Sequence, residues 1–262
     1  MLEVIDKGCS SESHPVPLLF VHGAWHGAWC WDEHFLEFFV DKGYRAVALS
    51  LRGHGNSPAR KRMQTCSIAD FVADVGSVAD KLPSRPVVIG HSMGGFIVQK
   101  YLESCDAPAG VLLATMPSRG LGGWLLREAK RHPFHMVRAI VTTKSLHAVN
   151  TPTLAREHFF SPGTPESDVV RYAARLGEQY VGRTMLDEAI LNLPKTERVT
   201  APLLVLGAAC DGCFTTEEVH ATARAYRTEA EFFPDMGHDM MLEPGWPAVA
   251  ERIHGWLATQ GL

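Results

Sequence analysis

The sequence predicts an α/β fold: a doubly wound, mostly parallel sheet with a helical insertion. Short apolar runs alternate with helical patterns along most of the 262 residues, as expected for parallel strands joined by helical crossovers. Three candidate polar residues, His22, Ser92 and Asp211, follow the ends of such runs. Ligands of open α/β sheets bind at this edge, outside the carboxyl ends of the strands.

The strands are predicted from uninterrupted apolar segments, which are typical of strands buried on both faces. We expect about six parallel strands, at 16–21, 44–50, 87–91, 110–114, 202–208 and 231–233, and one further possible strand within 1–15. Helical spacing of apolar residues marks the segments between them, at 32–42, 68–82, 96–102, 217–227 and 247–260. Ser67 and Asp70 form the expected N-cap pair of the helix that begins at 68.

Residues 117–195 interrupt this alternation, because they hold helical patches near 121–131, 134–142, 167–177 and 182–192 but no strong strand. We therefore expect a core domain of residues 1–116 and 196–262, with 117–195 as a helical cap over the strand ends. The cap carries 11 Lys and Arg against 7 Asp and Glu, whereas the body is acidic. A solvated helical surface is the simplest interpretation, and weak contact with anionic or lipid surfaces is the alternative.

Composition excludes several other classes of protein. A net charge of −4 gives no reason to expect a nucleic-acid partner. No apolar run is long enough to span a membrane. The first residues lack the pattern of a secretory signal, so we expect a cytoplasmic protein whose six cysteines are reduced thiols.

We expect neither a metal nor a cofactor. Cys210 and Cys213 match the C-x-x-C spacing, but a zinc site needs a second pair and a redox pair needs a thioredoxin-like unit. Histidines at 132 and 135 stand apart from any His-Glu-x-x-His pattern. The sequence leaves the oligomeric state open.

The most informative segment is Gly90-His91-Ser92-Met93-Gly94, which ends a β-branched run and leads into a helix. This is the strand–turn–helix context of a nucleophile elbow. Ser92 would occupy a strained turn, and glycines two positions away on either side avoid steric collision there. The sequence therefore predicts Ser92 as a nucleophile raised above the edge of the sheet.

A serine hydroxyl needs a base, which is itself oriented by an acid. In this fold the three follow in the order serine, acid, histidine. Asp211 comes after the strand at 202–208, and His238 lies between the last strand and the last helix. Asp235 and Asp239 are rival acids, but both belong to the loop of the base itself.

Two backbone N–H groups are needed to stabilise the oxyanion that forms during acyl transfer. The first should belong to Met93, the residue after the nucleophile, and the second to Ala24, in the loop after the strand at 16–21. We do not assign His22 as the base, because it precedes Ser92 in the chain. His54 and His91 are expected to have structural roles.

The sequence resembles the α/β-hydrolase superfamily through HGAW (22–25), RGHGNS (52–57), GHSMGG (90–95), ACDG (209–212) and MGHDMMLE (236–243). The run HGAWHGAWCW (22–31) is similar to a branch that contains plant methyl esterases, hydroxynitrile lyases and bacterial esterases. The resemblance implies serine-esterase chemistry and supports the N–H of Ala24 as an oxyanion donor. The lyases carry a lysine after the catalytic histidine, whereas Asp239 and Met240 follow His238 here.

The expected substrate is a small-molecule carboxylic ester with a sizeable apolar acyl or aryl group, such as a lysophospholipid or monoacyl ester. Trp25, Trp124, Phe134 and Phe159 are the candidates for its pocket, and core packing is the alternative for each of them. Two other functions use the same fold. One is C–C bond hydrolysis of ring-cleavage diketones, and the other is a non-enzymatic ligand receptor.

Overall fold

The computed structural model describes residues 1–59 and 62–262 of the chain. Its centre is a seven-stranded sheet in the order β1-β3-β2-β4-β5-β6-β7. Strands β2 to β7 run parallel to their neighbours, whereas β1 pairs antiparallel with β3. The predicted doubly wound, mostly parallel sheet is confirmed. The strands are β1 (Val4–Lys7), β2 (Leu18–Val21), β3 (Ala46–Leu49), β4 (Val87–His91), β5 (Gly110–Leu113), β6 (Leu203–Ala208) and β7 (Ala230–Phe233).

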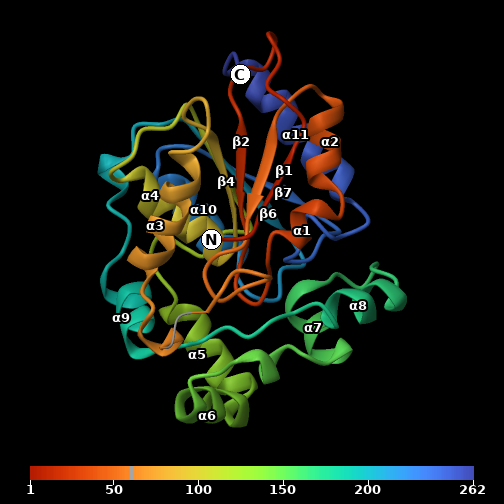
Figure 1. Cartoon of the computed structure of the whole chain (residues 1–262). Helices are drawn as coiled ribbons and strands as arrows, with labels where there is room; N and C mark the ends of the chain where they lie inside the picture. The colour runs from red at the N-terminus through yellow and green to blue at the C-terminus, as the bar shows by residue number, and fades with distance from the viewer. Residues whose placement is uncertain (60–61) are drawn as a thin grey trace.

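Helices cover both faces of the sheet (Figure 1). One face carries α1 (Trp29–Asp32), α2 (Phe35–Asp41) and α11 (Trp246–Thr259). The other face carries α3 (Ile68–Ala79), α4 (Met93–Leu102) and α10 (Thr216–Ala225). The predicted helix at 32–42 is in fact divided, because the backbone of His34 leaves the helical region with φ −145°.

The N-cap predicted for α3 is confirmed. The Ser67 hydroxyl accepts the backbone N–H of Asp70 at 3.0 Å, and the Asp70 carboxylate accepts the backbone N–H of Ser67 at 3.1 Å. This capping box satisfies two backbone donors that the first turn of the helix leaves without partners. It fixes where α3 begins.

Between β5 and β6 the chain forms a layer of helices at one end of the sheet (Figure 1). Four of them lie near the predicted helical patches: α5 (Gly122–Arg131), α6 (Pro133–Thr142), α8 (Glu166–Ala173) and α9 (Arg183–Leu191). A further helix, α7 (Pro152–Phe159), was not predicted. Its start signal is present, since the Thr151 hydroxyl accepts the N–H of Leu154 and proline occupies the first turn.

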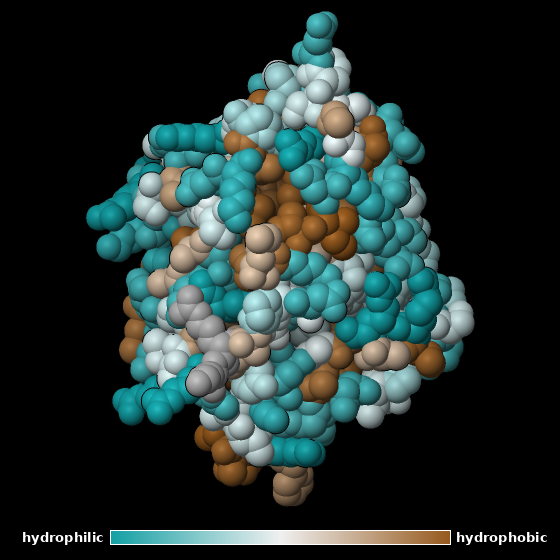
Figure 2. Space-filling model, viewed as in Figure 1, coloured by the Kyte–Doolittle hydropathy of each residue, from teal (hydrophilic) through white to brown (hydrophobic). Residues whose placement is uncertain are grey.

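The outer side of α6 is apolar and faces solvent. The exposed fraction of Phe134 is 87%, and Val137, Ile140 and Val141 are also exposed. In Figure 2 hydrophobic surface is visible at the lower end of the molecule, where Figure 1 places α6. We call these four residues the α6 patch.

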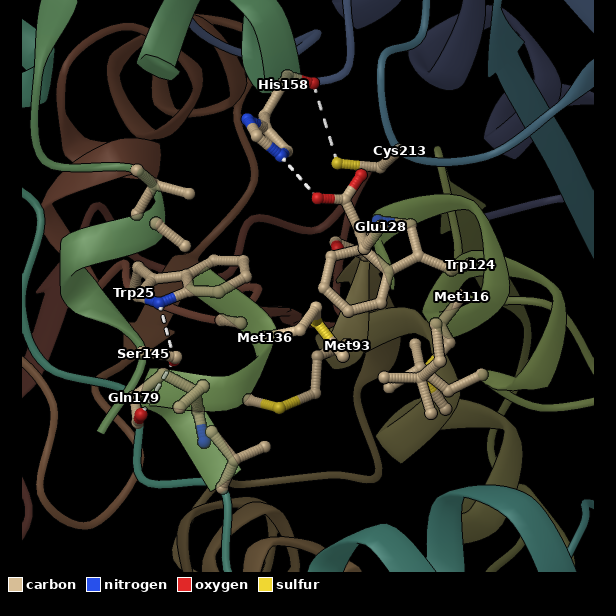
Figure 3. A pocket seen from close by; sticks show the side chains of 18 of the residues that line it. Trp25, Met93, Met116, Trp124, Glu128, Met136, Ser145, His158, Gln179 and Cys213 are labelled. Carbon is tan, nitrogen blue, oxygen red and sulfur yellow. Dashed lines mark hydrogen bonds and ion pairs between the residues drawn. The ribbon is translucent and has the colours of Figure 1, made fainter. Parts of the chain in front are cut away.

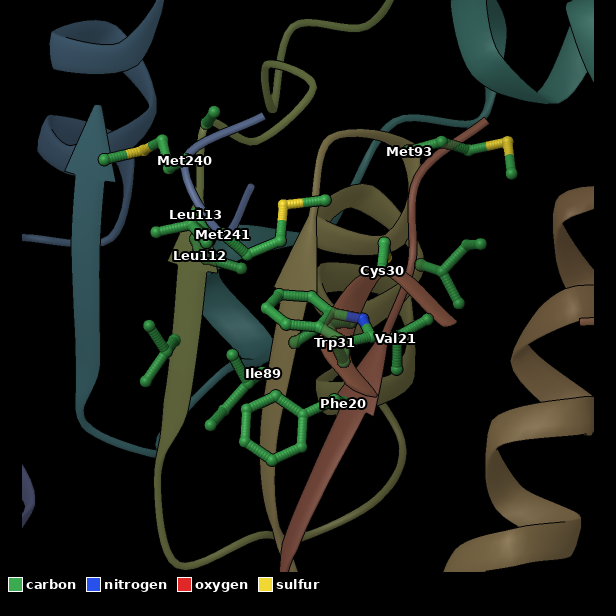
Figure 4. Packing of buried hydrophobic residues seen from close by; sticks show 14 of the residues in the cluster. Phe20, Val21, Cys30, Trp31, Ile89, Met93, Leu112, Leu113, Met240 and Met241 are labelled. Carbon is green, nitrogen blue, oxygen red and sulfur yellow. The ribbon is translucent and has the colours of Figure 1, made fainter. Parts of the chain in front are cut away.

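The core lies between the sheet and its helices. Phe20 of β2 packs against Trp31 of α1, with their ring centroids 5.1 Å apart, and both side chains are fully buried. Figure 4 shows this pair beside Ile89 of β4 and Leu112 of β5. Large aromatic side chains buried in this way dominate the energetics of a core, so the central strands form a rigid base for the loops at their ends.

Across residues 1–59 and 62–262, every helix is too short or too polar to cross a lipid bilayer.

Candidate active site

Ser92 lies between β4 and α4 in a strained turn, with φ 53° and ψ −121°. A Cβ on Gly94 would overlap the carbonyl oxygens of Val21 and His22, and a Cβ on Gly90 would overlap the backbone of Gly94. Both glycines thus avoid a steric collision, but with the end of β2 and with the start of α4 rather than with the backbone of Ser92. Such a conformation costs on the order of 1–3 kcal/mol and persists only where the surroundings hold it in place.

Backbone hydrogen bonds fix this turn. The N–H of Ser92 donates to the carbonyl of Leu113 at 3.1 Å, and the carbonyl of Ser92 accepts the N–H of Met116 at 2.9 Å. Both partners belong to β5 or the segment just after it, so the neighbouring strand anchors the elbow. Ser92 itself is partly exposed and lines the cavity described below.

The structure brings Asp211 and His238 together. Asp211 Oδ2 lies 2.9 Å from His238 Nδ1, and Asp211 Oδ1 accepts the N–H groups of Cys213 and Phe214 at 2.7 and 2.9 Å. The carboxylate is thus held in place by its own loop. The rival acids are placed elsewhere, because Asp235 is exposed and the Asp239 carboxylate pairs with His26 Nε2 at 3.0 Å.

His91, next to the nucleophile, links the elbow to the loop of His238. Its Nε2–H donates to the carbonyl of His238 at 3.0 Å, and the two rings lie 4.7 Å apart. Burial, together with the nearby His238, lowers the pKa of His91 to about 3, so the ring stays neutral. Among the described residues, the Ser92 hydroxyl makes no hydrogen bond to His238.

The two predicted oxyanion donors line the same cavity as Ser92. Neither the N–H of Ala24 nor that of Met93 donates to another group in the described part of the chain. The loop of Ala24 approaches the nucleophile closely, since a Cβ on Gly23 would lie 2.8 Å from the Cβ of Ser92. The carbonyl of Ala24 accepts a hydrogen bond from His26 Nδ1 at 2.7 Å, which orients this peptide segment.

His22 has a different role in the same loop. Its Nδ1–H donates to the carbonyl of Gly23 at 2.7 Å, and its Nε2 accepts the N–H of Leu51 at 3.0 Å. Burial keeps the pKa of His22 well below its usual value. Both ring nitrogens are occupied by backbone groups, so this side chain connects two loops at the sheet edge.

The end of α7 is clamped between the loops that carry Asp211 and His238. A Cβ on Gly212 would overlap the carbonyl of Glu157, and a Cβ on Gly237 would lie 2.6 Å from the nitrogen of Ser161. The N–H of Asp239 donates to the carbonyl of Phe159 at 2.9 Å. The helical layer is therefore fixed to both loops along residues 157–161.

A cavity of about 110 Å³ lies between the elbow and the helical layer. Trp25 and Trp124 line it, as predicted (Figure 3). The other two predicted pocket residues do not. Phe134 points to solvent, because it lies on the outer side of α6, and Phe159 is buried against Trp25 and His238 within the core.

Sequence reasoning missed the polar residues on the cavity wall. Glu128 and His158 are both buried there and form an ion pair, with Glu128 Oε2 3.1 Å from His158 Nε2. Ser145 and Gln179 also line the cavity, and the Ser145 hydroxyl accepts the indole N–H of Trp25 at 3.0 Å. Their types and spacing match no catalytic motif, so no sequence pattern marks them as pocket residues.

Three groups of side chains within the described residues have potential metal-ligand atoms within 4.8 Å of one another. Two of these groups include His238, whose Nδ1 already binds Asp211. The third consists of Glu128, His132 and His158.

The fold and the nucleophile elbow together define a protein of the α/β-hydrolase class. A model of the "Alpha/beta hydrolase family" matches residues 18–252, and the chain belongs to this family. The "Probable esterase PIR7A" of Oryza sativa subsp. japonica is 29% identical over 217 residues, which are 77% of this chain and 81% of that protein. The "Non-heme chloroperoxidase" of Burkholderia pyrrocinia is 37% identical over 107 residues, 38% of this chain and 37% of that protein.

Among solved structures, an esterase from Exiguobacterium antarcticum has the same fold, with a TM-score of 0.75. The alignment covers 98% of this chain and 95% of that one at 17% sequence identity. At this identity the likeness concerns the fold alone.

Proposed function

We propose that this protein is a serine hydrolase that cleaves a carboxylic ester with an apolar acyl or aryl group. The observation that carries the proposal is the buried hydrogen bond between Asp211 and His238, next to an elbow that presents Ser92 to an apolar cavity. The similarity to a rice protein named as a probable esterase over most of both chains supports the same reaction.

In the first half of the reaction, Ser92 Oγ attacks the ester carbonyl carbon while His238 Nε2 takes the hydroxyl proton. Asp211 holds the tautomer of His238 that leaves Nε2 free to accept it, and stabilises the imidazolium that forms. The negative charge develops on the former carbonyl oxygen, where the N–H groups of Ala24 and Met93 can stabilise it. The tetrahedral intermediate then collapses, His238 returns the proton to the departing alkoxide, and an alcohol leaves.

In the second half, water attacks the acyl group on Ser92 and gives its proton to His238. The second intermediate collapses, the proton returns to Ser92 Oγ, and the carboxylic acid leaves. The hydrogen bond between Ser92 and His238 must form during this cycle. Catalytic hydrogen bonds often tighten only when substrate is bound, so this bond is expected in the substrate complex.

A fluorophosphonate probe tests the proposal directly, because it reacts only with an activated serine. We expect covalent labelling of Ser92, and loss of labelling in the Ser92→Ala and His238→Ala variants. An unlabelled, folded wild-type protein would contradict the proposal and favour a ligand receptor. Labelled protein that cleaves ring-cleavage diketones but no ester would favour C–C bond hydrolysis.

A further inference from the structure

Most of the cavity wall is apolar, and the ion pair of Glu128 and His158 is a charged part of it. The side chains of these two residues are 5% and 2% exposed. Burying a charged pair is costly unless its hydrogen bonds are satisfied. A charged pair at this position in a ligand cavity therefore calls for an explanation.

His158 uses both of its ring nitrogens. Nδ1–H donates to the carbonyl of Leu154 at 2.8 Å, and Nε2–H donates to Glu128 Oε2 at 3.1 Å. Burial, the largest single effect, lowers the pKa of His158, but the hydrogen bonds to Glu128 and the carbonyl of Leu154, together with the charges of Glu128 and Glu157, raise this pKa overall. Burial, again the largest single effect, raises the pKa of Glu128, yet the hydrogen bond and charge of His158, with the charges of His132 and Arg131, together lower it. The pair is an imidazolium and a carboxylate with no net charge.

Glu128 has unused capacity as an acceptor. A carboxylate can accept several hydrogen bonds, yet only Oε2 has a donor among the described residues, and Oε1 has none. Trp124 stands one helical turn before Glu128 on α5, so the two side chains share one face of the helix. Its indole N–H is buried and has no acceptor in the described part of the structure.

Figure 3 shows Trp124 and Glu128 beside each other on the cavity wall, on the side away from Trp25. Buried polar groups without partners are rare in folded proteins. The indole N–H of Trp124 is such a buried group, whereas Glu128 Oε1 has no donor but is not fully buried. A donor and an acceptor in neighbouring positions of a ligand cavity fit a group that can both accept and donate a hydrogen bond. A hydroxyl group has both capacities.

Resting on the proposed ester hydrolysis, we propose that Trp124 and Glu128 bind a hydroxyl group on the apolar acyl or aryl part of the substrate. The hydroxyl oxygen accepts the indole N–H of Trp124, and the hydroxyl proton is donated to Glu128 Oε1. An ammonium group fits less well, because it offers Trp124 no acceptor. A carboxylate fits less well too, because it offers Glu128 Oε1 no donor. The substrate class is thus a hydroxylated ester.

A divalent metal ion is the competing occupant, since Glu128, His132 and His158 have ligand atoms close together. Two observations favour the hydroxyl group. His132 Nε2 is bound to Glu157 at 3.0 Å, and a metal would have to displace the proton that His158 donates to Glu128. A metal would also leave the N–H of Trp124 without a partner.

The experiment compares matched esters: methyl esters of straight-chain acids of about six to twelve carbons, and the same esters with a terminal hydroxyl. At the chain length that reaches from Ser92 to Glu128, we expect kcat/KM to be at least about tenfold higher for the hydroxylated ester. Trp124→Phe keeps a ring but removes the donor, so this preference should fall about fivefold. Trp256→Phe, on α11 and away from the cavity, is the matched control and should keep the preference unchanged.

Glu128→Gln replaces the carboxylate that accepts the hydrogen bond of the substrate hydroxyl group. The thermal unfolding of this variant is measured as well, to confirm that it folds. No preference at any chain length, or an unchanged preference in Trp124→Phe, would overturn the proposal. Zn²⁺ binding that Glu128→Gln abolishes and Trp124→Phe leaves intact would also overturn it, in favour of a metal site.

If no ester is cleaved, a binding measurement can still test whether Trp124 and Glu128 bind a hydroxyl group. Calorimetric titration of the wild-type protein with methyl ketones of the same chains, with and without the terminal hydroxyl, requires no catalysis. Tighter binding of the hydroxylated ketones, lost in Trp124→Phe, would support the subsite even though the proposed reaction had failed. Equal binding of both ketones would refute the subsite by itself.

Discussion

His238 Nδ1 lies 2.9 Å from Asp211 Oδ2, and the two side chains are only 1% and 2% exposed. A hydrogen bond to a carboxylate is stronger when water is excluded. The bond fixes the proton on Nδ1 and leaves Nε2 free to accept a proton. Most of the chemistry proposed for this site depends on that one tautomer.

The first prediction concerns this bond. Asp211→Asn should lower kcat for ester hydrolysis by roughly 10⁴-fold, because an amide stabilises the wrong tautomer of His238 and cannot support the imidazolium. Steady-state kinetics with a p-nitrophenyl ester measures the loss. The control is Asp235→Asn, an exposed aspartate from the loop of the base, which should keep nearly full activity. A fully active Asp211→Asn variant would show that another residue orients His238.

The second prediction separates helix propensity from packing. Gly94 and Gly255 both lie in helices, α4 and α11. A Cβ on Gly255 meets nothing within 4 Å, so Gly255→Ala should raise the free energy of unfolding by about 0.5–1 kcal/mol. A Cβ on Gly94 would overlap backbone carbonyls, so Gly94→Ala should lower the free energy of unfolding by at least about 1–3 kcal/mol. Urea unfolding measures the free energy of unfolding of both variants. Equal changes in the two variants would contradict the close approach of Gly94 to the backbone carbonyls at the elbow.

The third prediction concerns pH. The pKa of His91 is about 3 in the folded protein, so the unfolded chain binds a proton below pH 6.5 that the folded protein does not. Folding stability should therefore fall as the pH drops below about 6.5, by about 1.4 kcal/mol per pH unit for this group. His91 is packed near His26, His238 and Asp239, and its own titration is isolated by comparison with a variant.

His91→Gln keeps an N–H donor for the carbonyl of His238 but cannot titrate. Between pH 7 and pH 5 the wild type should lose roughly 2 kcal/mol more free energy of unfolding than this variant. Denaturant unfolding at the two pH values measures the difference. His22, whose pKa is also lowered by burial, should give both proteins a common residual slope. Equal losses in both proteins would mean that folding does not lower the pKa of His91.

The fourth prediction follows from the position of Phe134. Because it is 87% exposed and lies outside the cavity, Phe134→Ser should leave kcat/KM for soluble esters within about twofold of the wild type. The corresponding change at a cavity residue, Trp25→Ser, should lower kcat/KM for esters with long apolar groups. A large loss of kcat/KM in Phe134→Ser would show that Phe134 contributes to substrate binding after all.

The fifth prediction concerns lipid. The α6 patch is apolar and exposed, and Lys130, Arg131, Arg138 and Lys144 lie on or next to α5 and α6. Weak contact of this basic region with anionic lipid surfaces stays a prediction. We expect more cosedimentation with vesicles that contain anionic lipid than with zwitterionic vesicles, less at high salt, and least for Phe134→Ser. Equal cosedimentation of all proteins with both kinds of vesicle would refute it.

Much of the fold could be predicted because its strands are apolar over their whole length and begin or end at clear turn signals. The boundary of α3 follows from a capping box within four residues, which is local information. α7 was overlooked because its residues show no clear apolar stripe, although Thr151 and Pro152 mark its start.

The candidate site likewise contains some residues that the sequence identifies and others that it does not. Ser92, Asp211 and His238 are recognisable because the order of strands and loops constrains where they lie. The lining of the cavity depends on how the helices between β5 and β6 are turned. Trp124 faces inward and Phe134 outward, and no local pattern distinguishes the two. The sequence could not predict the pairing of Glu128 with His158 either. The two residues are 30 positions apart on different helices, and their contact depends on how those helices are turned.

The clamp at residues 157–161 has a consequence for protein engineering. A foreign set of helices grafted between β5 and β6 would replace backbone that Gly212 and Gly237 press against, and would remove the acceptor of the Asp239 N–H. Such a chimera should misplace both loops unless it keeps 157–161 as part of the recipient scaffold. A swap confined to α6 leaves that junction intact, whereas a new α5 must keep Glu128, the partner of His158. This makes α6 the module to exchange when new specificity is sought.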